Sequence, residues 1–187
     1  KDVPTKLPLG VIQGAVLQRG SELDIIIPNN PLKSKENTIA TGSLRRKAQW
    51  LNRFKTDKIV EIRGNVQTRL RKLKENNWNG TIMAKAGLER LEILPEYYQE
   101  LNWMIPAPAQ GAISVQNLTI KPSITKMLKQ INHVETEICT NIERSFLNKL
   151  EGGCTAPIGA YAKIANKSIV FRAVLLSAEG KNKIEIN

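Results

Sequence analysis

Two consecutive strand–turn–helix units, within residues 38–73, constrain the fold more than any other feature of this sequence. Residues 38–40 are typical of a short strand, and Ser43 is a good N-cap for a helix that follows it. The expected apolar face of this helix consists of Leu44, Ala48 and Leu51. Residues 58–62 predict the next strand, and Asn65 can cap a second helix. The expected inner face of the second helix includes Val66, Leu70 and Leu73.

Arginines occur where the electrostatics of a helix disfavour them. Arg45 and Arg46 fall in the first turn of one helix, and Arg63 and Arg69 flank the start of the other. Each cation at a helix N-terminus costs a few tenths of a kcal/mol to about 1 kcal/mol. The repetition favours two anion sites, where backbone N–H groups and guanidinium groups meet a carboxylate or a phosphate. The alternative is that these arginines are solvated surface residues.

A third unit follows, with a strand at residues 81–84 and a short helix at 88–91 that bears Arg90. Three such units in succession predict a parallel sheet with helices on its faces, hence an α/β fold. Ligands of such sheets bind beyond the carboxyl ends of the strands, which is where the arginines fall.

A strand is also expected at residues 103–105, followed by the constrained segment PAPAQG. Gln110 in this segment could donate to a ligand or equally could stabilise the loop. Extended structure resumes at residues 112–115. A strand, a rigid loop and a strand in this order are typical of a crossing between two lobes.

The C-terminal part predicts a separate α+β domain. Residues 135–150 form an amphipathic helix whose expected apolar stripe is Ile138, Ile142, Phe146 and Leu150. Cys139 is expected to be a buried core thiol, and Glu143 an ordinary charged position. The period-two alternation after residue 157 predicts a small antiparallel sheet. Cys154 follows two glycines on an exposed loop, where it is either a small turn residue or a functional thiol.

Composition narrows the classes of function. The formal net charge of +11 implies an acidic partner, such as nucleic acid, a membrane surface or a polyanionic small molecule. Aromatic residues make up only 5%, which disfavours single-stranded nucleic acid. Two cysteines and one histidine complete neither a zinc site nor a serine or cysteine triad, and no metal is expected. No apolar run approaches the roughly 18 residues of a membrane span, and a reduced, cytoplasmic setting is expected.

Six segments together resemble the porphobilinogen deaminase (hydroxymethylbilane synthase) family. They are KDVPT at 1–5, TGSLRRKAQ at 41–49, RGNVQTRLRKL at 63–73, AGLERL at 86–91, PAPAQGAI at 106–113 and ERSFLNKLEGGCTAPIGAYA at 143–162. The resemblance implies a transferase of tetrapyrrole (haem-type) biosynthesis that condenses four porphobilinogen units into hydroxymethylbilane and releases ammonia. It also implies a dipyrromethane cofactor bound by a thioether to Cys154, and a monomer with no nucleic-acid or membrane partner.

The same resemblance implies roles for individual residues. Asp2 matches the catalytic aspartate, which would hydrogen-bond pyrrole N–H groups and stabilise a positively charged azafulvene. The positions that match cofactor- or substrate-binding residues are Ser43, Arg45, Arg46, Arg63, Arg69 and Arg90, with Lys1, Thr41 and Gln110 as weaker matches. Because every pyrrole ring carries an acetate and a propionate, many arginines are needed to bind several rings.

The family layout implies a periplasmic-binding-protein-like, two-lobe architecture. Residues 1–17 and 112–132 would be a remnant of domain one, 18–111 domain two, and 133–187 the C-terminal domain. The chain begins at Lys1 without an initiator Met, so we expect a fragment that is inactive alone.

Four positions depart from the family pattern. Gly42 replaces the usual Ser, Pro108 and Ala109 replace Val-Gly, and Lys85 occupies a position that is usually small and apolar. We expect Pro108 and Ala109 to stiffen the crossing, and Lys85 to alter the charge of the pocket.

Two rival functions stay open at this point. One is a nucleic-acid-binding domain, whose affinity would fall steeply with salt. The other is a non-catalytic protein of the same architecture with a carboxylate ligand, which would have no use for Cys154.

Overall fold

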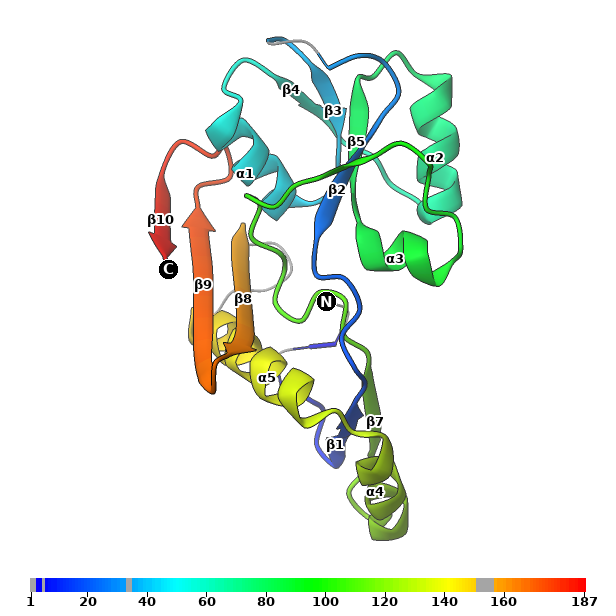
Figure 1. The fold of residues 1–187 in the computed structure, drawn as a ribbon, viewed down its shortest axis with the longest axis vertical. Helices are drawn as coiled ribbons and strands as arrows, with labels where there is room; N and C mark the ends of the chain where they lie inside the picture. Colours follow the sequence, from blue (N-terminus) through cyan, green and yellow to red (C-terminus); the bar gives the residue numbers. More distant parts are fainter. Residues whose placement is uncertain (1–2, 5, 33–34, 151–156) are drawn as a thin grey trace.

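A computed structural model of the chain describes residues 3–4, 6–32, 35–150 and 157–187. Its largest element is a five-stranded sheet in the order β4-β3-β5-β2-β6 (Figure 1). In chain order the strands are β2 (Asp24–Pro28), β3 (Thr38–Ala40), β4 (Lys58–Val60), β5 (Gly80–Ala84) and β6 (Gln99–Glu100).

This sheet is mixed, which corrects the expectation of a parallel sheet. Strand β3 runs parallel to β4 and β5, but β2 is antiparallel to both β5 and β6. Between β2 and β3 the structure describes no crossover helix, so the chain returns in the opposite direction, as it does between antiparallel strands. The parallel part is therefore limited to the βα units that the sequence predicted.

Helices cover both faces of the sheet, because successive side chains of a strand point to opposite faces. Ile26 packs on one face with Trp50 of α1 (Leu44–Arg53). Ile25 packs on the other face with Leu73 of α2 (Val66–Glu75) and Leu88 of α3 (Lys85–Arg90). Figure 1 shows α1 on one side of the sheet and α2 and α3 on the other. The predicted inner face of α2 is confirmed, since Val66 and Leu70 also pack against this second cluster.

The predicted apolar face of α1 is wrong at two of its three positions. Ala48 is fully buried, but Leu44 is 39% exposed and Leu51 is only partly buried. The buried residues of α1 are Arg45, Arg46, Ala48, Gln49 and Trp50. The reason is that α1 packs between two sheets: Trp50 contacts the central sheet, while Ala48 packs with residues of the C-terminal sheet. A wide buried face therefore includes polar side chains that periodicity assigns to solvent.

Residues 103–105 do not form the expected strand. Instead, the side-chain amide of Gln49 takes the place of a strand partner for Ile105. The Ile105 N–H donates to Gln49 Oε1 at 2.8 Å, and Gln49 Nε2 donates to the Ile105 carbonyl at 2.9 Å. The backbone polar groups of this buried residue are thus satisfied without a sheet.

The C-terminal part is a helix on a three-stranded antiparallel sheet, as predicted. It comprises α5 (Val134–Lys149), β8 (Ile158–Ala165), β9 (Ser168–Leu176) and β10 (Lys183–Ile186), with the strand order β10-β9-β8. The alternating residues Ile158, Ala160 and Ala162 are buried, which confirms the period-two pattern. The α/β architecture with an antiparallel C-terminal sheet is therefore established.

Glu143 corrects the expected burial of α5. The predicted stripe ends in Ile138 and Leu150, which are 40% and 41% exposed, whereas Glu143 is 0% exposed. The fully buried face of α5 consists of Thr136, Cys139, Thr140 and Glu143, at the helical spacing i, i+3, i+4 and i+7. Cys139 is buried, as expected.

The Glu143 carboxylate joins three parts of the chain. Oε1 accepts from Arg19 Nη1 at 2.6 Å and from the Ala162 N–H of β8 at 2.8 Å. Oε2 accepts from Arg19 Nη2 at 3.2 Å and from the Ala109 N–H at 2.6 Å. Arg19 in turn donates through Nε to the Gln110 carbonyl at 2.8 Å. A buried carboxylate that accepts four hydrogen bonds is satisfied, so Glu143 belongs to the interior.

A smaller two-stranded sheet forms the opposite end of the molecule. Strand β1 (Val11–Val16) pairs antiparallel with β7 (Ser114–Leu118), and α4 (Pro122–Leu128) and the 3-10 turn η1 (Lys129–Ile131) follow (Figure 1). The segments that connect this end to the central sheet lie side by side. The Leu17 N–H donates to the Ile113 carbonyl at 3.0 Å, and the Gly20 N–H donates to the Gly111 carbonyl at 3.1 Å.

Candidate functional site

A cavity of about 760 Å³ lies between the central sheet and these connecting segments. Arg46 of α1, Arg69 of α2 and Arg90 of α3 line it, and so does Glu89. The remaining lining residues are Gln18, Gly20, Gly64, Asn65, Val66, Met83, Ala84, Ala86, Gly87, Leu88 and residues 109–113. Three arginines against one carboxylate give this wall a net positive charge, which would suit an acidic ligand.

The N-terminus of α2 opens into the same cavity. Asn65 caps the helix as predicted, since its Oδ1 accepts from the Thr68 N–H at 2.8 Å. Gly64 precedes it with φ +120°, a conformation that favours glycine. The first N–H groups of a helix have no intrahelical acceptor and carry partial positive charge. Arg69 stays close to this end, because its Nε donates to the Gly64 carbonyl at 2.8 Å.

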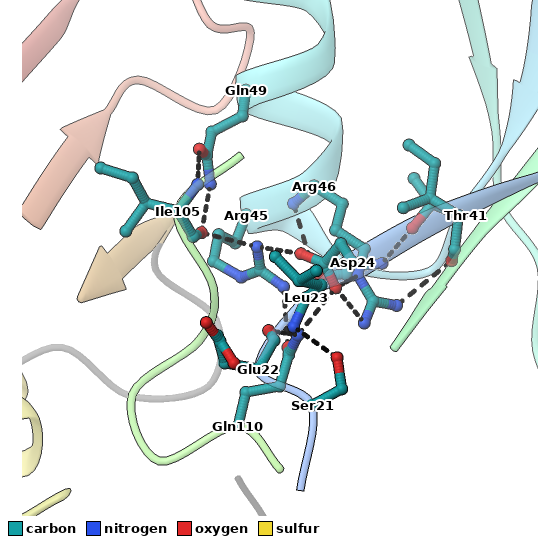
Figure 2. A network of polar contacts seen from close by, with 12 residues as sticks. Ser21, Glu22, Leu23, Asp24, Thr41, Arg45, Arg46, Gln49, Ile105 and Gln110 are labelled. Atoms are coloured by element: carbon teal, nitrogen blue, oxygen red, sulfur yellow. Dashed lines mark hydrogen bonds and ion pairs between the residues drawn. The ribbon is translucent and has the colours of Figure 1, made fainter. Parts of the chain in front are cut away.

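A buried cluster around Asp24 supports the cavity wall (Figure 2). The Asp24 side chain is 0% exposed. Its Oδ2 accepts from Arg45 Nη1 at 2.6 Å. Its Oδ1 accepts from Arg46 Nε at 2.9 Å and forms an ion pair with Arg46 Nη2 at 2.8 Å. Burial alone would raise the pKa of Asp24, but the two guanidinium charges and the hydrogen bonds outweigh it and hold the pKa below its usual value.

The two adjacent arginines have different environments. Arg45 does not line the cavity: Nη1 also donates to the Ile105 carbonyl at 2.8 Å, and Nη2 donates to Gln110 Oε1 at 3.2 Å. Arg46 lines the cavity, and burial lowers its pKa from the ordinary value, opposed by Asp24 and reinforced by the cations Arg45 and Arg69. Of the adjacent pair, Arg46 is therefore the one that faces the cavity.

Both the nitrogen and the oxygen of the Gln110 side-chain amide form hydrogen bonds within the protein. Its Nε2 donates to the Glu22 carbonyl at 2.7 Å and to Asp24 Oδ1 at 3.0 Å, and its Oε1 accepts from Arg45. Both amide hydrogens are thus used within the protein. Of the two roles that the sequence left open for Gln110, this geometry favours loop stabilisation.

Three further predicted site residues that the structure describes lie outside the cavity lining. Thr41 is buried, and its Oγ1 accepts from the Ser43 N–H at 3.2 Å. Ser43 caps α1 by accepting from the Arg46 N–H at 3.5 Å. Arg63 has an 83% exposed side chain and pairs with Glu61 at 2.7 Å. The structure therefore does not bring Arg63 together with Arg46, Arg69 and Arg90.

Lys1, Asp2 and Cys154 lie outside the described residues. Cys154 belongs by sequence to the connection between α5 and β8. The roles that the sequence assigns to these three residues stay predictions.

Lys85 does not alter the cavity in the expected way. Its Nζ pairs with Glu100 at 2.7 Å and lies 5.4 Å from the centroid of the Tyr98 ring. The hydrogen bond to Glu100 raises the pKa of Lys85. Lys85 is absent from the lining, and its charge is compensated locally.

Asp24 and Glu143 are the residues that sequence reasoning missed. Asp24 is a charged residue at the head of the apolar run IIIP, and a carboxylate there requires a cationic partner once the strand is buried. Glu143 follows Cys139 by four residues, so the expected burial of Cys139 already placed it on the inner face.

Comparisons with known proteins identify the family. The sequence model described as porphobilinogen deaminase, dipyromethane cofactor binding domain, matches residues 1–126. The model described as porphobilinogen deaminase, C-terminal domain, matches residues 137–187. The chain belongs to the porphobilinogen deaminase family.

Similar proteins named porphobilinogen deaminase occur in distant organisms. One from Desulforamulus reducens is 40% identical over 98% of this chain and 62% of its own length. One from Listeria monocytogenes is 39% identical over 99% of this chain and 63% of its own length. A probable porphobilinogen deaminase from Methanosarcina acetivorans is 40% identical over all of this chain and 61% of its own length. The chain thus spans about three fifths of the length of these deaminases.

Two features are absent from the described residues, a metal-binding cluster and a membrane-spanning helix. Within that part of the chain, no group of three or more His, Cys, Asp or Glu side chains is placed to hold a metal ion. No helix there combines the length and the hydropathy that a membrane span requires.

Proposed function

We propose that this protein condenses four molecules of porphobilinogen head to tail into hydroxymethylbilane, with release of ammonia at each condensation, in tetrapyrrole biosynthesis. The observation that carries the proposal is the cavity, where Arg46, Arg69 and Arg90 converge beside the N-terminus of α2. Each pyrrole ring of this substrate bears an acetate and a propionate, so a growing chain presents two carboxylates per ring. Fixed guanidinium groups bind carboxylates better than lysines do, because their donors match both oxygens.

The donor set of the cavity also fits a dipyrromethane cofactor, which has two carboxylates on each of its two rings. Arg46, Arg69, Arg90 and the free N–H groups of α2 would hold those carboxylates. When bound, the cofactor supplies the pyrrole end to which further rings are joined. We propose Cys154 as its thioether attachment point, which the LEGGC motif supports.

The catalytic group in this proposal is Asp2, on the strength of the KDVP motif. It would hydrogen-bond pyrrole N–H groups and stabilise positive charge as ammonia leaves. Arg63, Lys1, Thr41 and Ser43 are proposed ligand contacts on motif matches alone. Arg45 acts from behind the wall and Gln110 from within it, and the contacts of both hold Asp24 and Arg46 in place.

The domain layout in this proposal is the two-lobe, periplasmic-binding-protein-like one. The β1–β7 pair supports assigning residues 1–17 and 112–132 to one lobe and 18–111 to the other. The adjacent connections at Leu17–Ile113 and Gly20–Gly111 support two crossings between the lobes. Residues 133–187 form the C-terminal domain, and the protein is proposed to act as a cytoplasmic monomer.

The denatured intact mass of the full-length protein, before and after addition of porphobilinogen, tests this function. We expect a dipyrrole-sized adduct that grows by single pyrrole units and maps to the peptide of Cys154. The Cys154→Ser variant should lose the adduct, whereas the matched Cys139→Ser variant should keep it, because Cys139 is buried in the core. A folded wild-type protein without any adduct would contradict the proposal and leave a carboxylate-binding protein.

A further inference from the structure

We propose that Asp24 is a positioning residue that holds Arg46 in the cavity wall with its remaining donors directed at a substrate carboxylate. This inference rests on the proposed function, because it identifies the cavity ligand as the acidic substrate. Asp24 itself does not line the cavity and acts only through the groups that it binds.

The hydrogen bonds of Arg46 show what Asp24 fixes. A guanidinium group has five N–H donors in a rigid plane. Within the described part of the chain, Nε of Arg46 donates to Asp24 Oδ1, Nη2 forms an ion pair with the same oxygen, and one Nη1 hydrogen goes to the Ile82 carbonyl at 3.2 Å. At least one hydrogen therefore remains on each terminal nitrogen. Two such donors match the two oxygens of a carboxylate.

Asp24 also sets the charge behind the wall. Arg45 and Arg46 begin a helix, where the helix dipole disfavours cations, and both are buried. Two buried guanidinium groups and one carboxylate sum to a charge of +1. Without the carboxylate, two like charges would face each other out of water, which favours rotation of Arg46 toward solvent. Asp24 thus keeps one net positive charge and a fixed geometry at the wall.

Gln110 contributes to the same arrangement. Its Nε2 donates to the oxygen of Asp24 that Arg46 binds, while its Oε1 accepts from Arg45 (Figure 2). The carboxylate is therefore held from the strand, the helix and the crossing segment at once. Because contacts from several elements fix its position, Asp24 differs from a carboxylate that merely neutralises surface charge.

A double-mutant cycle in the full-length protein tests whether Asp24 acts through Arg46. We expect Asp24→Asn to raise KM for porphobilinogen about 10- to 100-fold, the loss expected for hydrogen bonds to a charged group, with a smaller effect on kcat. In the Arg46→Gln background the same change should add little. Additive effects on KM, or a KM that falls because the wall becomes more positive, would overturn the proposal. Arg71→Gln, an exposed change on α2 that only breaks a pair with Glu75, is the control and should leave KM unchanged.

A second readout does not depend on activity and separates this inference from the proposed function. Hydrogen exchange of the Arg46 Nε–H, followed by NMR of ¹⁵N-labelled arginine, should be slow in the wild type and fast in Asp24→Asn. Unchanged slow exchange in a folded Asp24→Asn variant would refute the positioning role, even where the adduct is present. If Asp24→Asn does not fold, Asp24→Glu keeps the charge but displaces it by one methylene. That variant should show intermediate exchange, and wild-type exchange in it would contradict the proposal.

Discussion

Glu143 offers the sharpest test of how the parts of this molecule are joined. Its carboxylate accepts four hydrogen bonds, two from Arg19 and one each from the Ala109 and Ala162 N–H groups. The Glu143→Gln substitution keeps the shape but replaces one oxygen by an NH₂ group. In either orientation of the amide, one guanidinium N–H and one backbone N–H then face another donor.

These contacts set the loss in the free energy of unfolding that Glu143→Gln should cause. A buried donor left without an acceptor costs about 1–3 kcal/mol, and breaking one partner of a buried ion pair costs about 3–5 kcal/mol in total. Glu143 is 0% exposed and the Arg19 side chain only 11%, so water cannot replace the lost acceptor. We expect Glu143→Gln to lower the free energy of unfolding by about 3–5 kcal/mol, a large part of the stability of an ordinary domain.

Urea unfolding of the full-length protein, followed by tryptophan fluorescence, measures this loss. The matched control is Glu135→Gln, an exposed position in the first turn of α5, which should cost no more than about 1 kcal/mol. Combining Glu143→Gln with Arg19→Met should cost less than the sum of the two single changes, because the pair is coupled. A loss below about 1 kcal/mol for Glu143→Gln, or strict additivity, would show that this junction does not stabilise the fold as argued.

Two further predictions concern the strain at Ala109 and the dependence of the free energy of unfolding on pH above pH 10. Ala109 has φ +61°, which favours glycine, so Ala109→Gly should leave the free energy of unfolding unchanged or raise it by up to about 1 kcal/mol. Ala107→Gly, which relieves no such strain, should lower it by a similar amount in the same urea series, and equal losses at both positions would contradict the assignment of strain. Burial and a hydrogen bond with Glu22 raise the pKa of Tyr161 to about 12. Because the unfolded chain ionises first, wild-type stability should fall between pH 10 and pH 12 more steeply than that of Tyr161→Phe, and parallel curves would rule out this contribution.

Local signals in the sequence predicted local structure well. The caps Ser43 and Asn65, the inner face of α2 and the alternation of β8 are all confirmed. Each depends on side chains within a few residues of one another, or on a helix that meets a single apolar layer. Periodicity alone is sufficient information in such cases.

The failures occur where one element contacts two layers or a distant polar partner. Helix α1 packs against two sheets, so its buried face is wider than an apolar stripe and includes Gln49. Gln49 binds the backbone of Ile105, which lies 56 residues further along the chain. The sequence therefore predicted a strand at residues 103–105, where a distant side chain supplies the backbone hydrogen bonds instead. No local pattern identifies a partner at that distance.

The candidate site shows the same division. The sequence identified Arg45 and Arg46 as misplaced cations, but the reason for the misplacement lies 21 and 22 residues upstream, in Asp24. A helix tolerates two arginines in its first turn here because a buried carboxylate compensates them. Arg45 is directed away from the cavity by this compensation, whereas Arg46 keeps N–H donors that no protein acceptor uses within the described residues. A violation of helix electrostatics thus marked the right place, but only the tertiary contacts distinguish the arginine that supports the wall from the one that faces the ligand.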